Sequence, residues 1–212
     1  MSRLVTFGCS YTWGQGFDDC PWGSSTPSKF AWPAELSEKM NLKLVNYGNP
    51  GASNLEILLR VLHSNLKQTD TVIILWTYCH RGLVFTDQYY ENSWKYKKIN
   101  NTTFKRFAPW LDENTNSTEF KEFFKVHNML DLTNQTWLHI QHANLYLNSL
   151  GINSYHYTVE DISPPEFIKI KNASYTNFDF LNPVDYAADN THPGVESQKK
   201  IANYIYDSIN QK

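Results

Sequence analysis

The sequence predicts an α/β protein in which helices cover both faces of a parallel β-sheet. Short apolar segments alternate along the chain with segments whose apolar residues recur at helical spacing. The run Val72–Trp76 is continuously apolar, which is typical of a strand buried on both faces. The 212 residues contain no repeat or low-complexity tract, so we expect a single domain over residues 1–212.

The N-terminal half is expected to begin with strand, helix, strand and helix. Arg3–Gly8 is an apolar strand that stops at a glycine, and Leu42–Tyr47 alternates before a Gly-Asn-Pro-Gly turn. Pro33–Met40 between them is predicted to be a helix, because its proline suits the first helical turn. Ser53 or Asn54 can cap the next helix. The apolar positions of that helix are Leu55, Leu58, Leu59 and Leu62.

The C-terminal half begins with a break in this pattern. Residues 83–117 are rich in aromatic and polar residues and are predicted to form an insertion or cap. Helical spacing then resumes, and one of the helices ends at Gly151, a residue type that favours a helix C-terminus. The predicted helices are Thr118–Leu130, Asn134–Leu150 and Val195–Ile209, with a strand at Ile152–Thr158 and a short segment at Phe167–Ile170.

Charge and cysteine content exclude several classes of function. The 19 basic and 21 acidic residues give a net charge of −2, so no global positive field is present to bind nucleic acid or an anionic membrane. The longest aliphatic run is too short to cross a bilayer. Cys9, Cys20 and Cys79 form no CxxC pair and are odd in number, which favours a reduced compartment. With no signal peptide in the sequence, we expect a cytoplasmic protein.

Three polar segments fall at comparable places in the predicted fold. Ser10 follows the first strand, Gly48–Ser53 follows the second, and Asp189–Gly194 precedes the last helix. The first two should lie side by side, because the carboxyl ends of parallel strands share one edge of the sheet. Ser10, Asp189 and His192 each have an ordinary structural interpretation when taken singly. Together they match an activated serine, in which the imidazole removes the hydroxyl proton and the carboxylate fixes its tautomer.

These three blocks resemble those of the SGNH (GDSL-type) esterase superfamily, in the same order along nearly the whole chain. The segment "FGCSYT" resembles the Gly-Asp-Ser block, "NYGNPGASN" the block with an oxyanion-hole glycine, and "DNTHPG" the Asp-x-x-His-Pro block. The resemblance implies a three-layer α/β/α sandwich with a flavodoxin-like sheet. It also implies a serine esterase with Ser10, Asp189 and His192 as catalytic residues, and with the amides of Ser10 and Gly51 in the oxyanion hole. Gly48 is the second choice for this glycine. No metal or organic cofactor is expected.

One block departs from the family pattern. The family usually follows its third strand with Gly-x-Asn-Asp, whose asparagine completes the oxyanion hole, whereas this chain reads "WTYCHRG" there. Thr77, Cys79 or His80 would have to supply the missing donor. Loss of one such donor typically costs about 10²- to 10³-fold in rate.

The expected substrate is a small-molecule or polysaccharide ester, with acetyl on a carbohydrate favoured by the polar, aromatic insertion. The residues expected to contact it are Trp13, Trp76, Tyr78 and Arg81. One alternative is an inactive carbohydrate- or protein-binding module on the same scaffold, and another is an acyltransferase that uses the same acyl-enzyme. The stacking platforms of the binding module would be Trp13, Trp22, Trp76, Trp94 and Trp110.

His139 and His142 lie three residues apart on the predicted helix Asn134–Leu150 and so share one face. This spacing could present two imidazoles to a metal ion. No cysteine or carboxylate pair joins them, so we expect a solvated face and no metal site.

Overall fold

The central element is a parallel sheet of five strands. The computed structural model describes residues 2–87, 96–99, 102–108, 118–165, 174–177 and 182–211. The strands of this sheet are β1 (Arg3–Gly8), β2 (Lys43–Gly48), β3 (Thr71–Trp76), β7 (Asn153–Thr158) and β8 (Ser174–Asn177), in the order β2-β1-β3-β7-β8. Every neighbouring pair is parallel. This is the flavodoxin-like order, with its switch point between β1 and β3, as the sequence predicts.

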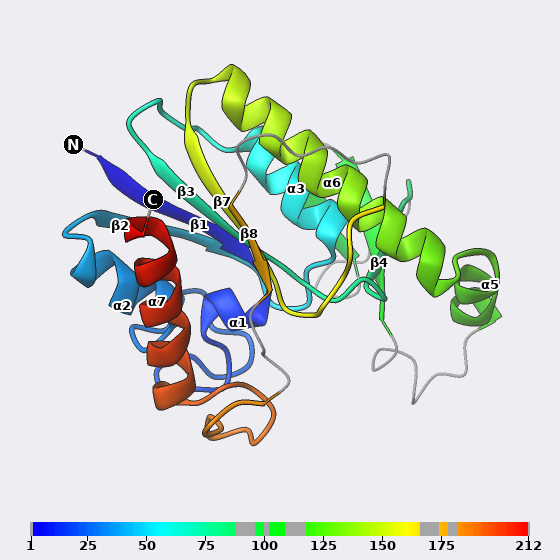
Figure 1. The fold of residues 1–212 in the computed structure, drawn as a ribbon. Coiled ribbons are helices and arrows are strands. Elements are labelled where there is room, and N and C mark those ends of the chain that lie inside the picture. Colours follow the sequence, from blue (N-terminus) through cyan, green and yellow to red (C-terminus); the bar gives the residue numbers. More distant parts are fainter. Residues whose placement is uncertain are drawn as a thin grey trace.

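Helices cover both faces of this sheet (Figure 1). On one face lie α2 (Trp32–Lys39) and α7 (Val195–Asn210), which pack against each other. On the other lie α3 (Asn54–His63) and α6 (Met129–Ser149). The predicted three-layer α/β/α architecture is therefore confirmed.

Two apolar clusters hold the layers together. Val5 and Phe7 of β1 point toward α3 and α6, where Trp137 is fully buried. Leu4 of the same strand points to the opposite face, where it packs in a cluster with Trp32 of α2. Both faces of β1 are thus apolar and buried, because successive side chains of a strand alternate between the faces of a sheet.

The short helix α1 (Ser10–Trp13) lies directly on the ends of β1 and β2. A Cβ atom added to Gly8 would lie 2.1 Å from Thr12 Oγ1, and one added to Gly48 would lie 2.8 Å from the Trp13 amide nitrogen. Asn46 Nδ2 also donates to the Thr12 carbonyl at 2.8 Å. Only glycines allow this close approach, so the two strand ends fix where α1 begins.

A smaller antiparallel sheet is present where the sequence indicated only an insertion. It contains β4 (Gly82–Phe85), β5 (Tyr96–Ile99) and β6 (Thr102–Phe107) in the order β4-β6-β5. Lysine, asparagine and threonine interrupt the apolar alternation in this region, and so the strands gave no clear signal.

Other element boundaries also differ from the prediction. The helices α5 (Thr118–Val126) and α6 are separated before Met129, because Asn128 Oδ1 accepts the Asp131 amide at 3.0 Å and caps α6. The second predicted helix therefore starts earlier than Asn134. Strand β8 was not predicted, and the predicted segment Phe167–Ile170 lies outside the described residues.

None of the three cysteines forms a disulfide bond. Cys9, Cys20 and Cys79 are all free and buried. Within the described parts of the chain, no helix combines the length and apolarity needed to cross a membrane.

We predict that Gly8→Ala destabilises the protein by about 1–3 kcal/mol, because the new methyl group overpacks against Thr12 and the Leu75 carbonyl. Thr12→Ala in the same chain should restore part of the loss by removing the closest atoms. Urea unfolding of the wild type, both single variants and the double variant measures this coupling. An unchanged midpoint in Gly8→Ala would show that α1 does not depend on the close approach.

Candidate functional site

A cavity of about 560 Å³ lies at the carboxyl end of the sheet, where α1, the turn after β2 and the segment before α7 meet. Its lining residues are Ser10, Tyr11, Trp13, Gln15, Pro21, Trp22, Gly23, Ser24, Asn49, Pro50, Gly51, Arg81, Arg106, Thr191 and His192. Ser10, Gly51 and His192, which the sequence predicts to act together, thus line one cavity although they are far apart along the chain.

Ser10 is the first residue of α1 and is nearly buried. Its carbonyl accepts the amides of Gly14 and Gln15, which anchors the helix immediately after β1. The Ser10 amide has no acceptor within the helix, as is general for the first residues of a helix. Its hydroxyl and its amide therefore both belong to the start of a rigid turn at the cavity wall.

Gly51 lies in a tight turn over residues 49–52. The amide of Ala52 donates to the Asn49 carbonyl at 3.0 Å, and Gly51 has a φ of 74° after Pro50. Proline followed by a residue with positive φ is the signature of a type II turn, in which glycine is favoured at the third position. The hydrogen bond of the turn does not use the Gly51 amide, and this residue lines the cavity.

His192 is held by Asp189 in the segment before α7. His192 Nδ1 lies 2.6 Å from Asp189 Oδ2, while Asp189 Oδ1 accepts the backbone amides of Thr191 and His192, both at 3.0 Å. A hydrogen bond from Nδ1 leaves Nε2 as the basic nitrogen. The Tyr11 and Trp22 rings approach the imidazole edge-on at centroid distances of 5.7 and 6.4 Å. This arrangement fixes both the tautomer and the orientation of the ring.

The loop after α1 packs against the Asp189 carboxylate. Gly16 has a φ of 97°, and a Cβ atom there would lie 2.5 Å from Asp189 Oδ2. Next to this contact, Phe17, Cys20 and Ala187 form a small buried cluster. The loop after α1 and the segment that carries Asp189 and His192 are therefore in direct contact.

The Asp189 carboxylate is ionised at neutral pH. Its partial burial acts to raise its pKa, but the amides of Thr191 and His192 and the imidazole of His192 together outweigh burial and hold the pKa below its ordinary value. A charged acceptor strengthens the hydrogen bond to His192 and stabilises the imidazolium that forms when this ring accepts a proton.

Ser10 and His192 are both described, and no hydrogen bond joins the Ser10 hydroxyl to the imidazole. Catalytic hydrogen bonds are often long without substrate and tighten only in the complex. The structure brings the predicted nucleophile and base to the same cavity, with the base already bonded to its carboxylate.

None of the three predicted third oxyanion donors lies on the described wall of this cavity. The Thr77 side chain is buried, and its amide donates to Asn54 Oδ1 at 2.8 Å. The Cys79 amide donates to the Glu160 carboxylate, and His80 stacks on Tyr78. The backbone amides of Thr77 and Cys79 are bonded to the side chains of Asn54 and Glu160, a pairing that the sequence does not reveal.

The predicted substrate contacts divide into two groups. Trp13 and Arg81 line the cavity, whereas Tyr78 is not part of its described wall, and the Tyr78 hydroxyl lies 3.2 Å from the Tyr11 hydroxyl. Trp76 is fully buried in the core, where Nε1 donates to His156 Nδ1 at 3.2 Å. The expectation that Trp76 contacts substrate is wrong, because the last residue of β3 faces α6 and not the edge of the sheet.

Burial lowers the pKa of His156 to about 4, so the ring is uncharged at neutral pH. An uncharged ring can accept the hydrogen bond from the Trp76 indole N–H, which makes this buried contact favourable.

Trp22, a predicted stacking platform, lines the cavity and is 70% exposed. The other two platforms, Trp94 and Trp110, lie outside the described residues.

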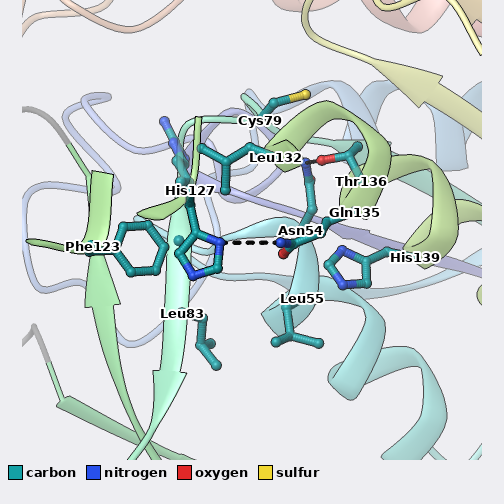
Figure 2. Close-up of a pocket in the computed structure, with 12 residues that line it drawn as sticks. Asn54, Leu55, Cys79, Leu83, Phe123, His127, Leu132, Gln135, Thr136 and His139 are labelled. Carbon is teal, nitrogen blue, oxygen red and sulfur yellow. Dashed lines mark hydrogen bonds between the residues drawn. The ribbon is translucent and has the colours of Figure 1, made fainter. Parts of the chain in front are cut away.

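A second, much smaller cavity of about 50 Å³ lies between α3, α6 and β4 (Figure 2). His127 and Gln135 make a hydrogen bond in its wall, and His139 also lines it. Burial is the main cause that lowers the pKa of His139 to about 4, and the charge of the nearby His142 lowers it further. Among the described residues no group of three or more His, Cys, Asp or Glu side chains is arranged to hold a metal ion.

Comparison with solved structures identifies the fold. The chain aligns with an acetylxylan esterase from Geobacillus stearothermophilus at a TM-score of 0.54 and 13% identity, covering 98% of this chain and 93% of that one. It aligns with a protein assigned to the G-D-S-L lipolytic family from Desulfitobacterium hafniense DCB-2 at 0.50 and 15% identity, covering 97% and 98% of the two chains. The fold is that of the SGNH (GDSL-type) esterases.

A third similar structure is a carbohydrate esterase whose active site displays divergent catalytic and non-catalytic binding functions. The TM-score is 0.58 at 12% identity, and the alignment covers 99% of this chain but 65% of that one. No family model matches the sequence, and no curated protein matches it in sequence. The SGNH-type likeness is therefore a likeness of fold.

Asn49 and Arg106 are among the lining residues that were not singled out from the sequence. Asn49 lies inside the Gly-Asn-Pro-Gly turn, where it reads as an ordinary turn residue. Arg106 comes from β6 of the insertion, and no local pattern connects it to a loop more than fifty residues earlier.

We predict that Asp189→Asn lowers the free energy of unfolding at neutral pH and that the difference from wild type shrinks on acidification. A carboxyl group whose pKa is depressed by folding contributes stability above its unfolded pKa and loses it as the pH falls through the folded pKa. Urea unfolding between pH 7 and pH 3, followed by tryptophan fluorescence, measures the difference. Asp207→Asn, at an exposed site on α7, serves as the control. A pH-independent difference would contradict an ionised Asp189 carboxylate in the folded protein.

Proposed function

We propose that this protein is a serine esterase that acts through Ser10, His192 and Asp189. The observation that carries the proposal is the meeting of the Ser10 hydroxyl, the Gly51 turn and an Asp189-bonded imidazole at one cavity. Each of these groups has another explanation alone, but the three together match the chemical needs of acyl transfer. The SGNH-type fold of known esterases supports the same reaction class.

In the proposed reaction, Ser10 Oγ attacks the ester carbonyl while His192 Nε2 takes the hydroxyl proton. Asp189 keeps the imidazole in the required tautomer and stabilises its positive charge. The oxyanion accepts hydrogen bonds from the amides of Ser10 and Gly51. His192 then delivers the proton to the leaving alcohol, and an acyl group remains on Ser10. His192 then takes a proton from water, whose oxygen attacks the acyl carbonyl, and returns that proton to Ser10 Oγ as the acid leaves.

The substrate we favour is a small acyl ester, such as acetyl, on a carbohydrate. A cavity of about 560 Å³ is within the usual range for small ligands. Trp13 and the exposed Trp22 offer flat apolar surfaces against which a sugar ring can stack. Two of the similar structures are a carbohydrate esterase and an acetylxylan esterase. The proposed reaction needs no cofactor, and the cysteine pattern favours a cytoplasmic location for it.

A second candidate is carbohydrate binding without turnover. The observation that favours it is the position of Thr77, Cys79 and His80, all away from the cavity wall as described, so that no side chain predicted for the third oxyanion donor is in place. Acyl transfer to another alcohol would use the same acyl-enzyme as hydrolysis.

We expect a fluorophosphonate probe to add one adduct to the wild-type protein, detected by intact mass, and none to Ser10→Ala. Hydrolysis of p-nitrophenyl acetate should fall by about 10⁴-fold or more in Ser10→Ala and in His192→Ala, because each removes a member of the proposed catalytic unit.

Ser24→Ala is the matched control, since Ser24 lines the same cavity and its hydroxyl donates to the Thr26 carbonyl at 2.8 Å. The fluorophosphonate probe should label Ser24→Ala at the same rate as the wild-type protein. A folded wild type that does not label but binds xylo-oligosaccharides in calorimetry would favour the binding module over the esterase.

A further inference from the structure

A buried carboxylate lies directly behind the Gly51 turn. Glu56, in the first turn of α3, is fully buried, and Ser53 Oγ accepts its amide at 3.3 Å. Burial acts to raise the pKa of this carboxyl, but the charges of Arg106 and Arg60 and the hydrogen bonds from Arg106 and Asn49 hold it below the ordinary value. Glu56 is therefore a buried charge that is balanced by specific partners.

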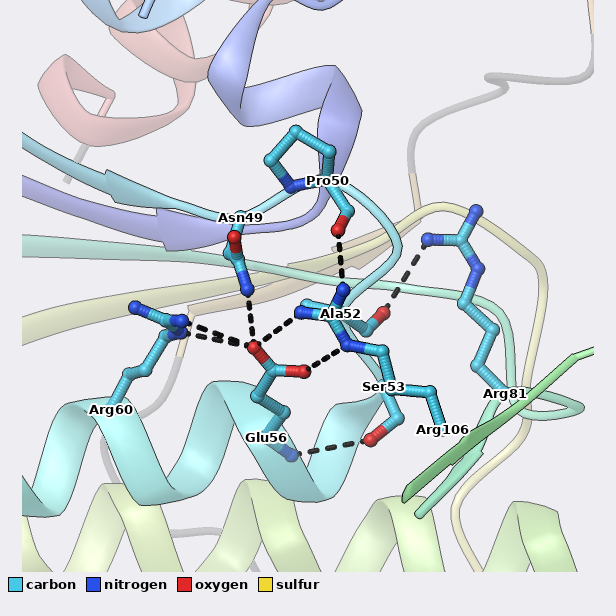
Figure 3. Close-up of polar contacts among 8 residues, drawn as sticks. All are labelled: Asn49, Pro50, Ala52, Ser53, Glu56, Arg60, Arg81 and Arg106. Atoms are coloured by element: carbon cyan, nitrogen blue, oxygen red, sulfur yellow. Dashed lines mark hydrogen bonds and ion pairs between the residues drawn. The ribbon is translucent and has the colours of Figure 1, made fainter. Parts of the chain in front are cut away.

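Arg106 is the main partner of Glu56 (Figure 3). Its Nε and one terminal nitrogen donate to the two carboxylate oxygens at 2.8 and 2.7 Å, and its side chain is only 2% exposed. This two-pronged geometry is the one in which an arginine-carboxylate pair is strongest. Because Arg106 belongs to β6 and Glu56 to α3, the pair joins the insertion to the main fold.

The remaining terminal nitrogen of Arg106 reaches the turn itself. It donates to the Pro50 carbonyl at 2.9 Å. That carbonyl and the Gly51 amide belong to the same peptide group, and the described chain contains no cis peptide bond. In a trans peptide the C=O and N–H point in opposite directions. The Gly51 N–H is therefore directed away from the Arg106 guanidinium.

The same hydrogen bond also affects the donor strength of Gly51. A cationic donor on a peptide carbonyl polarises the peptide group, and hydrogen bonds linked through one group strengthen one another in a low-dielectric environment. Donors that are fixed in advance and aimed at a developing charge contribute most to electrostatic catalysis.

Both ends of the turn are held by further contacts. Asn49 Nδ2 donates to the Glu56 carboxylate, and an Arg81 terminal nitrogen donates weakly to the Ala52 carbonyl at 3.4 Å. Figure 3 shows these groups converging on the turn from α3, from the segment after β3 and from β6.

We propose that Arg106 is a positioning residue for the oxyanion site, which aims and polarises the Gly51 amide through the Pro50 carbonyl while Glu56 fixes its guanidinium. This inference rests on the proposed esterase function. The insertion thus contributes to the reaction step itself as well as to the wall of the cavity. The side chains predicted to supply a third donor to the oxyanion lie away from the cavity wall. The amides of Ser10 and Gly51 therefore carry more of the oxyanion charge.

The test uses variants that keep the buried charges balanced. Arg106→Lys keeps a cation beside Glu56, but an ammonium lacks the planar fork that reaches the carboxylate and the Pro50 carbonyl together. The double variant Glu56→Met/Arg106→Met removes both charges, which is often tolerated when removal of one is not. Arg60→Met is the matched control, because Arg60 binds the same Glu56 oxygen at 3.2 Å without a hydrogen bond to the turn.

Two quantities are measured in each folded variant, with folding checked by the thermal midpoint. For p-nitrophenyl acetate we expect kcat to fall by about 10- to 100-fold in Arg106→Lys and in the double variant. This is less than the loss expected when an oxyanion-hole donor is removed completely. KM should change by less than about threefold, because the affected amide acts on the transition state. In ¹H–¹⁵N spectra the Gly51 amide proton should move upfield in both variants. Arg60→Met should change neither quantity.

The outcomes separate this inference from the proposed function. Folded Arg106 variants with wild-type kcat and an unmoved Gly51 resonance overturn the positioning role. Equal losses in Arg60→Met would also overturn it, because they would point to general support of α3. If the wild type neither labels nor hydrolyses esters, the proposed function fails, and the Gly51 resonance alone then decides whether Arg106 polarises that amide.

Discussion

The parallel pairing of β1 with β2 is the constraint on which the site depends. Gly8 lies opposite Gly48 in the register, and the Asn49 amide continues the ladder by donating to the Gly8 carbonyl at 2.9 Å. The strands β1 and β2 therefore end at the same level of the sheet. The chain continues from β1 into Ser10 and from β2 into the Gly51 turn. The absence of side chains at both glycines lets α1 rest on this edge. Ser10 and Gly51, the proposed nucleophile and oxyanion donor, are separated by about forty residues and are thereby brought to one edge of the sheet.

The proposed base, His192, reaches this edge through polar contacts rather than strand pairing. The segment before α7 folds around the Asp189 carboxylate, which accepts two backbone amides and the His192 ring. Gly16 packs against the same carboxylate, so the loop after α1 also limits where Asp189 and its bonded His192 can lie. On the opposite side, the Glu56–Arg106 pair supports the Gly51 turn from behind. Three separate parts of the fold are thus fixed around one cavity.

The sequence was informative where chemistry follows from local pattern. Apolar periodicity predicted four of the five strands of the parallel sheet and the helices that cover it. Ser10, Gly51 and His192 line one cavity at the predicted edge, and Asp189 is bonded to His192 there. Pattern could not show which way Trp76 faces, because a continuous apolar strand gives the same signal for both of its faces. It could not find the antiparallel insertion sheet either, or Arg106, since their partners are distant in sequence and depend on pairing that only the folded chain displays.

The crystal structure of the wild-type protein after reaction with a fluorophosphonate is the measurement that tests the proposed site most directly. We expect continuous density from Ser10 Oγ to phosphorus, a phosphoryl oxygen within about 3 Å of the Ser10 and Gly51 amides, and His192 Nε2 on the leaving-group side. An adduct on another residue would contradict the assignment of Ser10. An adduct on Ser10 whose phosphoryl oxygen lies away from Gly51 would contradict the oxyanion site.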